Sequence, residues 1–383
     1  MIKRGIATFT LDSGKCPKWL FDRMVSLGSQ MIEIIVEEYG PDEFIQRISD
    51  PVWFQALGTV LAFDWNASGL TTILTGALKQ AIKGKEKSLG IFICGGKGKT
   101  SLKTPDEINA WGEQLSLPES EVKNLVYNSK TSAKVDSCLV QDGYQLYHHA
   151  FFFSKNGKWT VVQQGMNTEN TTARRYHWYS DNIKDIVCEP HSGIVSQIKS
   201  LCLDLTAKES GNTRKTSTDI VSNNNYSSLI KDINIIRKYA TKNSKMVSFQ
   251  NSGEQLVFLE LSHDEFYWHP VVNEDFSKSK YLEKILWVLC DRKPENYEKI
   301  LITEGVGPKT IRALSLVSEV IYGAKPSYQD PARYSFAHGG KDATPYPVDI
   351  KTYDSSIEFF RNVIRKIKAS PFEKEKLLKK INT

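Results

Sequence analysis

Apolar residues recur every three or four positions over much of the chain, which is the spacing of a helix with one buried face. Residues 17–39 show this most clearly, with Pro17 at the start and Gly40-Pro41 at the end. The apolar positions of this predicted helix are Trp19, Leu20, Met24, Leu27, Met31, Ile34 and Ile35. Shorter helices are predicted at residues 41–48, 51–63, 71–83, 105–115 and 119–125.

Strand patterns alternate with these helices. Residues 89–94 form a short apolar run typical of a buried strand, and residues 144–153 and 159–164 are also strand-like. The last two segments flank Asn156-Gly157, which is the strongest local hairpin signal in the chain. We therefore expect residues 1–206 to form an α+β domain whose sheet contains a β-hairpin.

The composition changes at residues 207–227, which are rich in Ser, Asn and Thr and poor in large apolar groups. This composition predicts a linker or mobile loop. Helical spacing then returns and predicts an all-α C-terminal domain over residues 228–383, in which residues 323–350 form a long irregular loop. The predicted fold class is α+β, with an α+β domain followed by a helical one.

Composition and charge exclude only a few classes of function. Fifty Lys and Arg residues against 44 Asp and Glu residues give a net charge of +6, which by itself identifies no partner. No apolar run approaches the ~20 residues of a membrane helix, so we expect no membrane association. The six cysteines are scattered singly, which excludes a CxxC-type zinc or redox site. We expect a reduced, cytoplasmic protein.

Residues 301–314 carry the clearest motif of the chain. A predicted helix is followed by Gly305-Val306-Gly307, and a second predicted helix starts with Pro308-Lys309-Thr310. This pattern resembles the helix-hairpin-helix motif, which holds the nucleic-acid backbone without reading bases. We expect the backbone contacts to come from Gly305, Gly307, Lys309, Thr310 and Arg312. The structural alternative is a plain helical corner.

The C-terminal stretch 361–383 supports a polyanionic partner. It holds eight basic residues and only two acidic ones, so its charge excess equals that of the whole chain. The alternative is a solvated helix face. The expected partner is nucleic acid, with DNA as the leading choice.

A second interpretation of the same motif is catalytic. The segment is similar to glycosylases of the endonuclease III type, in which the lysine after Gly-x-Gly-x forms a Schiff base and a later carboxylate assists it. The resemblance places the nucleophile at Lys309 and the carboxylate at Asp349, although 40 residues separate them. His338, Lys341 and Asp342 would then shape a base pocket. No cysteines of an iron–sulfur cluster follow, and the alternatives are a phosphate-binding Lys309 and a helix-capping Asp349.

Polar residues are crowded between positions 134 and 191, where four of the seven histidines fall. We expect Asp136 and Asp142 to hold a divalent metal, Mg²⁺ or Mn²⁺, because such an ion neutralises charge on phosphate oxygens. A base would come from His148 or His149, which point to opposite faces of a strand. Gln163 and His177 complete the candidate catalytic set, and Arg174 and Arg175 are candidate nucleic-acid contacts. The alternative is a structural sheet with hydrogen-bonded histidines and a surface arginine pair.

The glycine-rich segment Gly95–Thr100 follows a predicted strand. It lacks the first glycine of the Walker pattern because position 93 is Ile, so no nucleotide cofactor is expected. Lys97 and Lys99 are candidate contacts to backbone phosphates.

Six further motifs are distinctive, namely Trp53–Gln55, Ala133–Asp136, Gln141–His149, Val162–Asn167, Ala173–Trp178 and Asp330–Asp342. Together they resemble the archaeal and bacterial family known as domain of unknown function 763, and the similarity spans nearly the whole chain. The resemblance implies an archaeal source as plausible but no particular chemistry.

Three hypotheses follow from these patterns. The leading one is a metal-dependent nuclease of DNA repair or recombination. The alternatives are a DNA glycosylase/AP lyase that uses Lys309 and Asp349, and a non-enzymatic protein that binds DNA or RNA. The sequence leaves the oligomeric state open.

Overall fold

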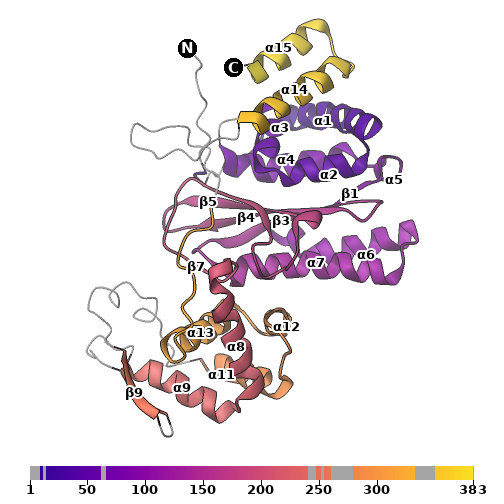
Figure 1. Cartoon of the computed structure of the whole chain (residues 1–383). Coiled ribbons are helices and arrows are strands. Elements are labelled where there is room, and N and C mark those ends of the chain that lie inside the picture. Colours follow the sequence, from indigo (N-terminus) through magenta and orange to yellow (C-terminus); the bar gives the residue numbers. More distant parts are fainter. Residues whose placement is uncertain are drawn as a thin grey trace, which may run out of the picture.

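The computed structural model describes residues 9–11, 14–61, 66–239, 247–251, 254–259, 279–332 and 350–382. A central sheet lies between two layers of helices (Figure 1). One layer consists of α1 (Lys18–Tyr39), α2 (Pro41–Ser49), α3 (Pro51–Val60) and α4 (Ala67–Ala81). The other consists of α6 (Thr104–Leu115) and α7 (Glu119–Cys138), while the short α5 (Glu86–Leu89) leads into the sheet. The mixed α+β fold class is thus confirmed.

The sheet has five antiparallel strands in the order β1-β3-β4-β5-β6. Their bounds are β1 (Ile91–Lys97), β3 (Gln145–Ser154), β4 (Trp159–Asn167), β5 (Thr172–Tyr179) and β6 (His191–Ser196). β3 and β4 form the predicted hairpin around Asn156-Gly157, where Gly157 has a φ of +84° that favours glycine. A separate two-stranded ladder joins β2 (Val140–Gln141) to β7 (Leu203–Asp204).

Alternation of side chains along the strands gives the sheet two apolar faces. Phe151, Phe153 and Val161 belong to the core on the α6–α7 side. Their neighbours Ala150, Phe152 and Val162 belong to the core beneath α1–α4. The sheet is therefore buried on both sides, and any polar residue within it must find its partners inside the protein.

The predicted linker is wrong, because most of residues 207–227 is helical. The helix α8 (Gly211–Asn223) buries Ile220 and Val221 and packs against α13 (Pro308–Val320). Its small polar residues serve as contacts between elements: Ser217 and Ser318 form a hydroxyl–hydroxyl hydrogen bond of 2.9 Å. The polar side chains of this segment therefore include groups that form hydrogen bonds between packed helices and are not exposed to solvent.

The segment after α8 is mainly helical. α9 (Tyr226–Tyr239), α11 (Lys280–Arg292) and α12 (Tyr297–Ile302) gather with α8 and α13 beyond the α6–α7 layer (Figure 1). It also contains the hairpin of β8 (Val247–Asn251) and β9 (Glu254–Leu259), so the prediction of an all-α C-terminal domain is wrong in this respect.

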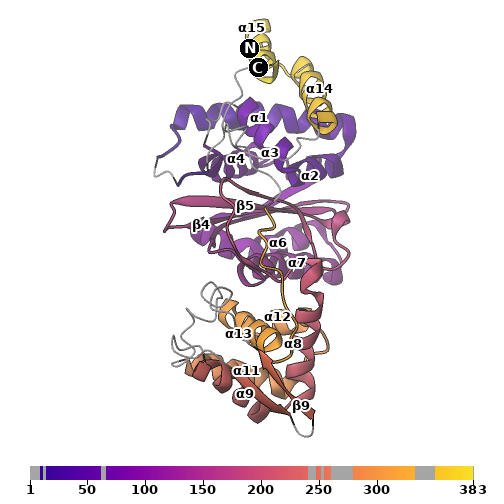
Figure 2. The ribbon, with the colours of Figure 1, turned by 60° about the vertical axis from the view of Figure 1, so that its left-hand side comes forward.

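The last two helices do not join that helical group. α14 (Ile350–Lys366) and α15 (Pro371–Asn382) lie at the opposite end of the molecule, on the outside of the α1–α4 layer (Figures 1 and 2). Trp53 of α3 stacks on Phe360 of α14, with ring centroids 5.2 Å apart. The single domain predicted over residues 228–383 is therefore divided between the two ends of the molecule. In the part of the chain that the structure describes, no helix has the length and apolar character needed to cross a membrane.

Candidate nucleic-acid interface and the buried polar sheet

The helix, turn and helix predicted at residues 301–314 are confirmed as local structure. α12 ends at Ile302, and the turn is closed by the amide of Val306, which donates to the carbonyl of Thr303 at 3.2 Å. α13 then begins with Pro308, whose missing N–H costs nothing at the first helical position.

The two glycines of the turn have different surroundings. Gly305 has a φ of +85°, and a Cβ there would lie 2.4 Å from Cδ1 of Ile285, so it packs closely on α11. Gly307 has extended backbone, and a Cβ there would meet no atom within 4 Å. Gly305 therefore has a structural reason to be glycine, whereas packing gives Gly307 none.

The start of α13 is open to solvent. Its N-cap residue is Gly307, and no side chain caps the helix. Lys309 is exposed, and within the described residues no carboxylate forms an ion pair with it. Thr310 is 3% exposed, so its side chain does not belong to this surface.

The corner is fastened to the sheet domain by three side chains. Nε of Arg312 donates to Oε1 of Gln141 at 2.6 Å, and Nε2 of the same glutamine donates to the carbonyl of Pro308 at 3.0 Å. Nζ of Lys134 donates to the carbonyl of Thr303 at 3.2 Å, and partial burial lowers the pKa of Lys134. Arg312 is thus half-buried and hydrogen-bonded to Gln141, and its contact with phosphate stays a prediction.

Asp136 of α7 lies at the centre of a buried polar cluster. Its Oδ2 accepts hydrogen bonds from Gln163 at 2.5 Å and from the indole of Trp178 at 3.0 Å. Its Oδ1 lies 2.5 Å from Nε2 of His191, and the carboxylate is fully buried. Both oxygens are therefore engaged by protein groups.

The cluster continues through His149. Oε1 of Gln163 must accept from Nδ1 of His149, 3.0 Å away, because the amide nitrogen is already directed at Asp136. Nε2 of His149 is then the acceptor for the hydroxyl of Ser129 at 2.9 Å. Burial lowers the pKa of His149, which favours the neutral ring that this chain of bonds requires.

Asp142 belongs to a second buried group. Oδ2 accepts from NH1 of Arg174 at 2.9 Å and from the hydroxyl of Tyr176 at 2.7 Å, while Oδ1 accepts from the amide of Tyr144 at 3.0 Å. NH2 of Arg174 donates to Asp330 at 2.7 Å. Burial raises the pKa of Asp142, and the Arg174 charge opposes this shift.

The other candidate residues lie on the opposite face of the sheet. Nε2 of His148 is 3.1 Å from the hydroxyl of Thr75, and Nδ1 of His177 is 3.1 Å from the carbonyl of Ile48. NH1 of Arg175 lies 3.2 Å from the hydroxyl of Thr71. Burial lowers the pKa of His148 to about 3 and that of Arg175 to about 9. The structure therefore brings His149, Gln163 and Asp136 together. It places His148 and His177 on the opposite face of the sheet.

Two of these observations correct the predictions. Arg174 and Arg175 are fully buried, so the prediction that they contact nucleic acid is wrong. Asp136 and Asp142 do not fit a shared metal site, because each has its oxygens filled by separate protein donors. Within the described residues, no group of three or more His, Cys, Asp or Glu side chains could hold a metal ion.

The glycine-rich loop is accessible, unlike the sheet residues. Lys97 and Lys99 are exposed, and Nζ of Lys97 lies 5.9 Å from the ring centroid of Tyr147. Gly95 is fixed by packing, since a Cβ there would lie 2.3 Å from the carbonyl oxygen of His149. His338, Lys341, Asp342 and Asp349 lie outside the described residues.

Sequence reasoning missed several members of the buried groups. Trp178, Tyr176, His191, Ser129 and Asp330 make the contacts described above but were not singled out as site residues. Trp178 and Tyr176 alternate with Arg175 and His177 on β5, and this period-two pattern could have indicated two chemically distinct faces.

The molecule so described is a mixed α+β protein with buried polar clusters in its sheet and an exposed corner between α12 and α13. A family model described as a protein of unknown function (DUF763) matches residues 5–348, and the chain belongs to this family. The resemblance expected from the sequence motifs is thereby confirmed. Neither the curated proteins nor the solved structures yielded a match.

Proposed function

We propose that this protein binds the backbone of nucleic acid, with DNA as the leading ligand, through the corner of α12 and α13. One observation carries the proposal: the uncapped N-terminus of α13 meets solvent at Gly307, where no packing requires glycine, beside the exposed amine of Lys309. The absence of a Cβ at Gly307 lets a ligand approach the backbone closely.

The chemistry of this surface suits a phosphate group. The first amides of a helix have no intrahelical acceptor, and the helix dipole favours negative charge at this end. Lys309 adds a full positive charge. Such contacts hold the phosphodiester chain without reading bases, so binding should depend strongly on salt and weakly on sequence.

The test is fluorescence anisotropy with labelled double- and single-stranded DNA over a range of salt concentrations. Lys309→Ala should weaken binding and should lower the slope of log K against log salt by about one. Gly307→Ala should weaken binding without loss of stability, because its Cβ points into open space.

Lys184→Ala is the matched control, because Lys184 is also an exposed lysine but lies in the loop between β5 and β6. Equal binding by the wild type, Lys309→Ala and Gly307→Ala would refute the proposed site. Measurable binding by none of the proteins would refute the function.

Bond cleavage is not part of this proposal. Both carboxylate oxygens of Asp136 and of Asp142 are engaged by protein donors, so the proposal assigns these residues no metal. The lyase alternative needs a desolvated amine, whereas Lys309 is exposed. Binding by the corner is the function that the geometry supports best.

A further inference from the structure

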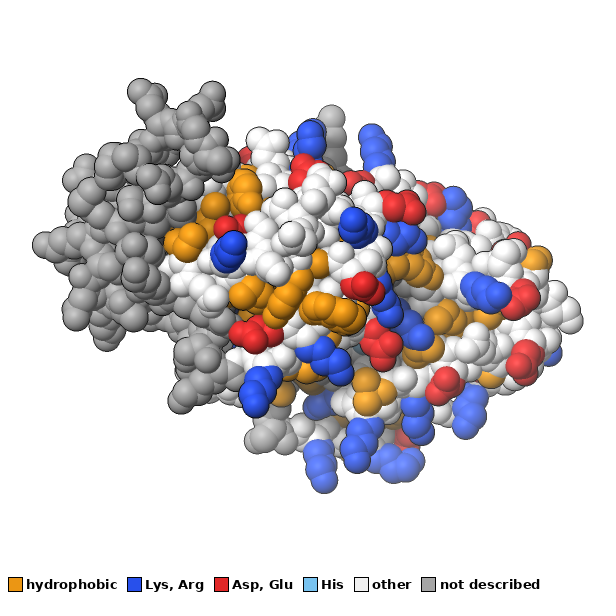
Figure 3. Space-filling model, turned by 90° about the horizontal axis from the view of Figure 1, so that it is seen from below, with side chains coloured by type: hydrophobic (Ala, Val, Ile, Leu, Met, Phe, Trp, Pro, Cys, Tyr) orange, Lys and Arg blue, Asp and Glu red, His pale blue; other side chains and the backbone are white. Residues whose placement is uncertain are grey.

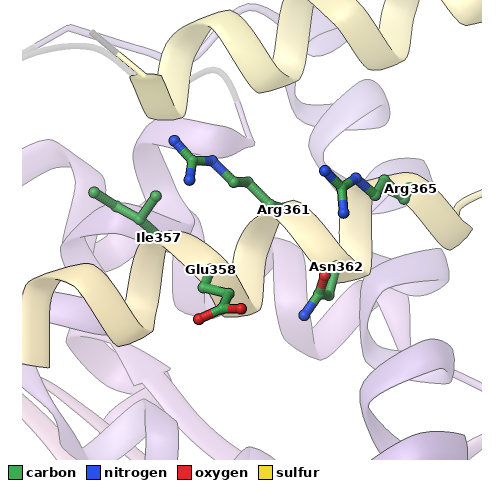
Figure 4. A pocket seen from close by; sticks show the side chains of 5 residues that line it. All are labelled: Ile357, Glu358, Arg361, Asn362 and Arg365. Atoms are coloured by element: carbon green, nitrogen blue, oxygen red, sulfur yellow. The ribbon is translucent and has the colours of Figure 1, made fainter.

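The outward side of α14 forms a second basic surface, far from the α12–α13 corner. A shallow pocket on this helix is lined by Ile357, Glu358, Arg361, Asn362 and Arg365. Figure 4 shows the guanidinium groups of Arg361 and Arg365 directed to the same side of the helix. We propose that these two arginines bind phosphates of a second nucleic-acid segment, so that one chain bridges two segments.

The charge of this surface fits a polyanion. Residues 357–379 contain seven basic and three acidic side chains. Lys366 pairs with Glu38 at 2.6 Å, and Lys379 pairs with Glu375 at 2.7 Å. Within the described residues, no ion pair is found for Arg365 or Lys376, and both side chains are exposed.

The spacing of the arginines also favours a ligand. Side chains four residues apart lie on one side of a helix, so one phosphate can meet both guanidinium groups. Each planar guanidinium can donate two parallel hydrogen bonds to phosphate oxygens. Glu358 and Asn362 point to another side of α14 than the two guanidinium groups do (Figure 4).

α14, which carries the two arginines, is packed against the body of the protein. Its inner face is buried against the α1–α4 layer through Phe359, Phe360, Val363 and Ile364, and Ile367, directly after the helix, belongs to the same core. The guanidinium group of Arg47 in α2 lies 3.5 Å from the ring centroid of Phe359. The helix backbone that carries Arg361 and Arg365 is therefore fixed against the body of the protein.

The two surfaces act independently because of their positions. The α12–α13 corner and α14 lie at opposite ends of the molecule, with α7, the sheet and the α1–α4 layer between them (Figures 1 and 2). Each of these three layers is roughly 10 Å thick. The separation of the two basic surfaces therefore exceeds the distance of about 8 Å over which salt screens charges under physiological conditions. Each end must therefore meet its own stretch of backbone.

This inference rests on the proposed function of the corner, and a bridging assay tests it. One duplex is fixed to beads through biotin, and a second, fluorescent duplex is added with the full-length protein. The wild type should retain the fluorescent duplex on the beads. Replacing both Arg361→Ala and Arg365→Ala should reduce this retention by at least about tenfold, because charged hydrogen bonds are lost. Binding of a single duplex through the corner should remain.

Two further proteins sharpen the result. The pair Arg361→Lys and Arg365→Lys keeps the charge but loses the forked geometry, and it should bridge at an intermediate level. The pair Lys184→Ala and Lys208→Ala removes the same charge from other exposed positions and should bridge like the wild type.

The stoichiometry separates this inference from its alternatives. Light scattering at saturation should give two duplexes for one chain. One duplex per chain, or undiminished bridging by the double alanine protein, would overturn the inference while leaving the corner as a binding site. Failure of the wild type to bind any duplex would instead overturn the proposed function itself.

Discussion

Arg174 and Asp142 form an ion pair from which solvent is fully excluded, with 2.9 Å between NH1 and Oδ2 and neither side chain exposed. The same guanidinium reaches Asp330, 2.7 Å away, which lies beyond α13 in the sequence. Arg174 therefore joins β5 of the sheet both to Asp142 and to the segment that follows α13.

Removal of this guanidinium should be costly. Arg174→Leu leaves the carboxylates of Asp142 and Asp330 without their cation, and the free energy of unfolding should fall by about 3–5 kcal/mol. Urea denaturation followed by circular dichroism measures the change. Arg292→Leu, at an exposed position on α11, should change it by less than about 0.5 kcal/mol. A similar small change in both variants would show that the buried pair does not stabilise the fold.

Stability should also fall as the pH is lowered below neutrality. Burial lowers the pKa of His177 well below its ordinary value, and the Arg175 charge lowers it further. Below a pH of about 6.5 the unfolded chain takes up a proton at this residue and the folded chain does not, so protonation favours unfolding. Between pH 7.5 and 5.5 this histidine should remove about 1.4 kcal/mol of stability.

A variant isolates this contribution from those of other groups. His177→Phe removes the titrating ring, so its loss of stability between the two pH values should be about 1.4 kcal/mol smaller than that of the wild type. Urea titrations of both proteins at both pH values provide the comparison. Equal losses would mean that His177 takes up its proton in the folded state.

The sequence predicted secondary structure correctly where buried positions were apolar and turns carried glycine. The helix of residues 18–39 and the β3–β4 hairpin followed from apolar spacing and from Asn156-Gly157. β5 could not be found in this way, because Arg174, Arg175 and His177 are polar but wholly buried. Their partners come from distant segments, so the pattern along the strand carries no sign of burial.

The same dependence on distant segments explains why the burial of the candidate site residues was not predicted. Crowding of polar residues at positions 134–191 was visible, but whether they faced solvent or one another depended on α2–α4 and α7 covering both sides of the sheet. The sequence also could not predict where α14 packs. Its amphipathic spacing shows that one face is buried but does not identify the helices that cover this face.

The two glycines of the corner should respond differently to a methyl group. Gly305→Ala places a Cβ 2.4 Å from Ile285 at a φ of +85°, so thermal stability should fall by an amount equivalent to about 1–3 kcal/mol. Gly307→Ala should leave the melting temperature nearly unchanged. Differential scanning calorimetry of both variants provides the measurement, and equal melting temperatures would contradict the packing described for α11.

Docking of α14 should depend on the stacked pair of Phe360 and Trp53. Phe360→Ala opens a cavity in a fully buried position and should cost about 3–5 kcal/mol. Limited proteolysis should then cut between α13 and α14 sooner than in the wild type. Phe372→Ala is the control, because that ring on α15 is 77% exposed, and its digestion pattern should match the wild type. Unchanged digestion of Phe360→Ala would show that other contacts suffice to hold α14.

The return of the chain to its starting layer has a consequence for synthesis. The amide of Lys368 donates to Oε1 of Gln30, 338 residues earlier in the chain. At ribosomal speeds of about 5–20 residues per second, the first helical layer waits roughly 20–70 seconds for the helix that covers it. During translation the apolar surface around Trp53 therefore stays open to water, chaperones and other nascent chains until α14 has been made.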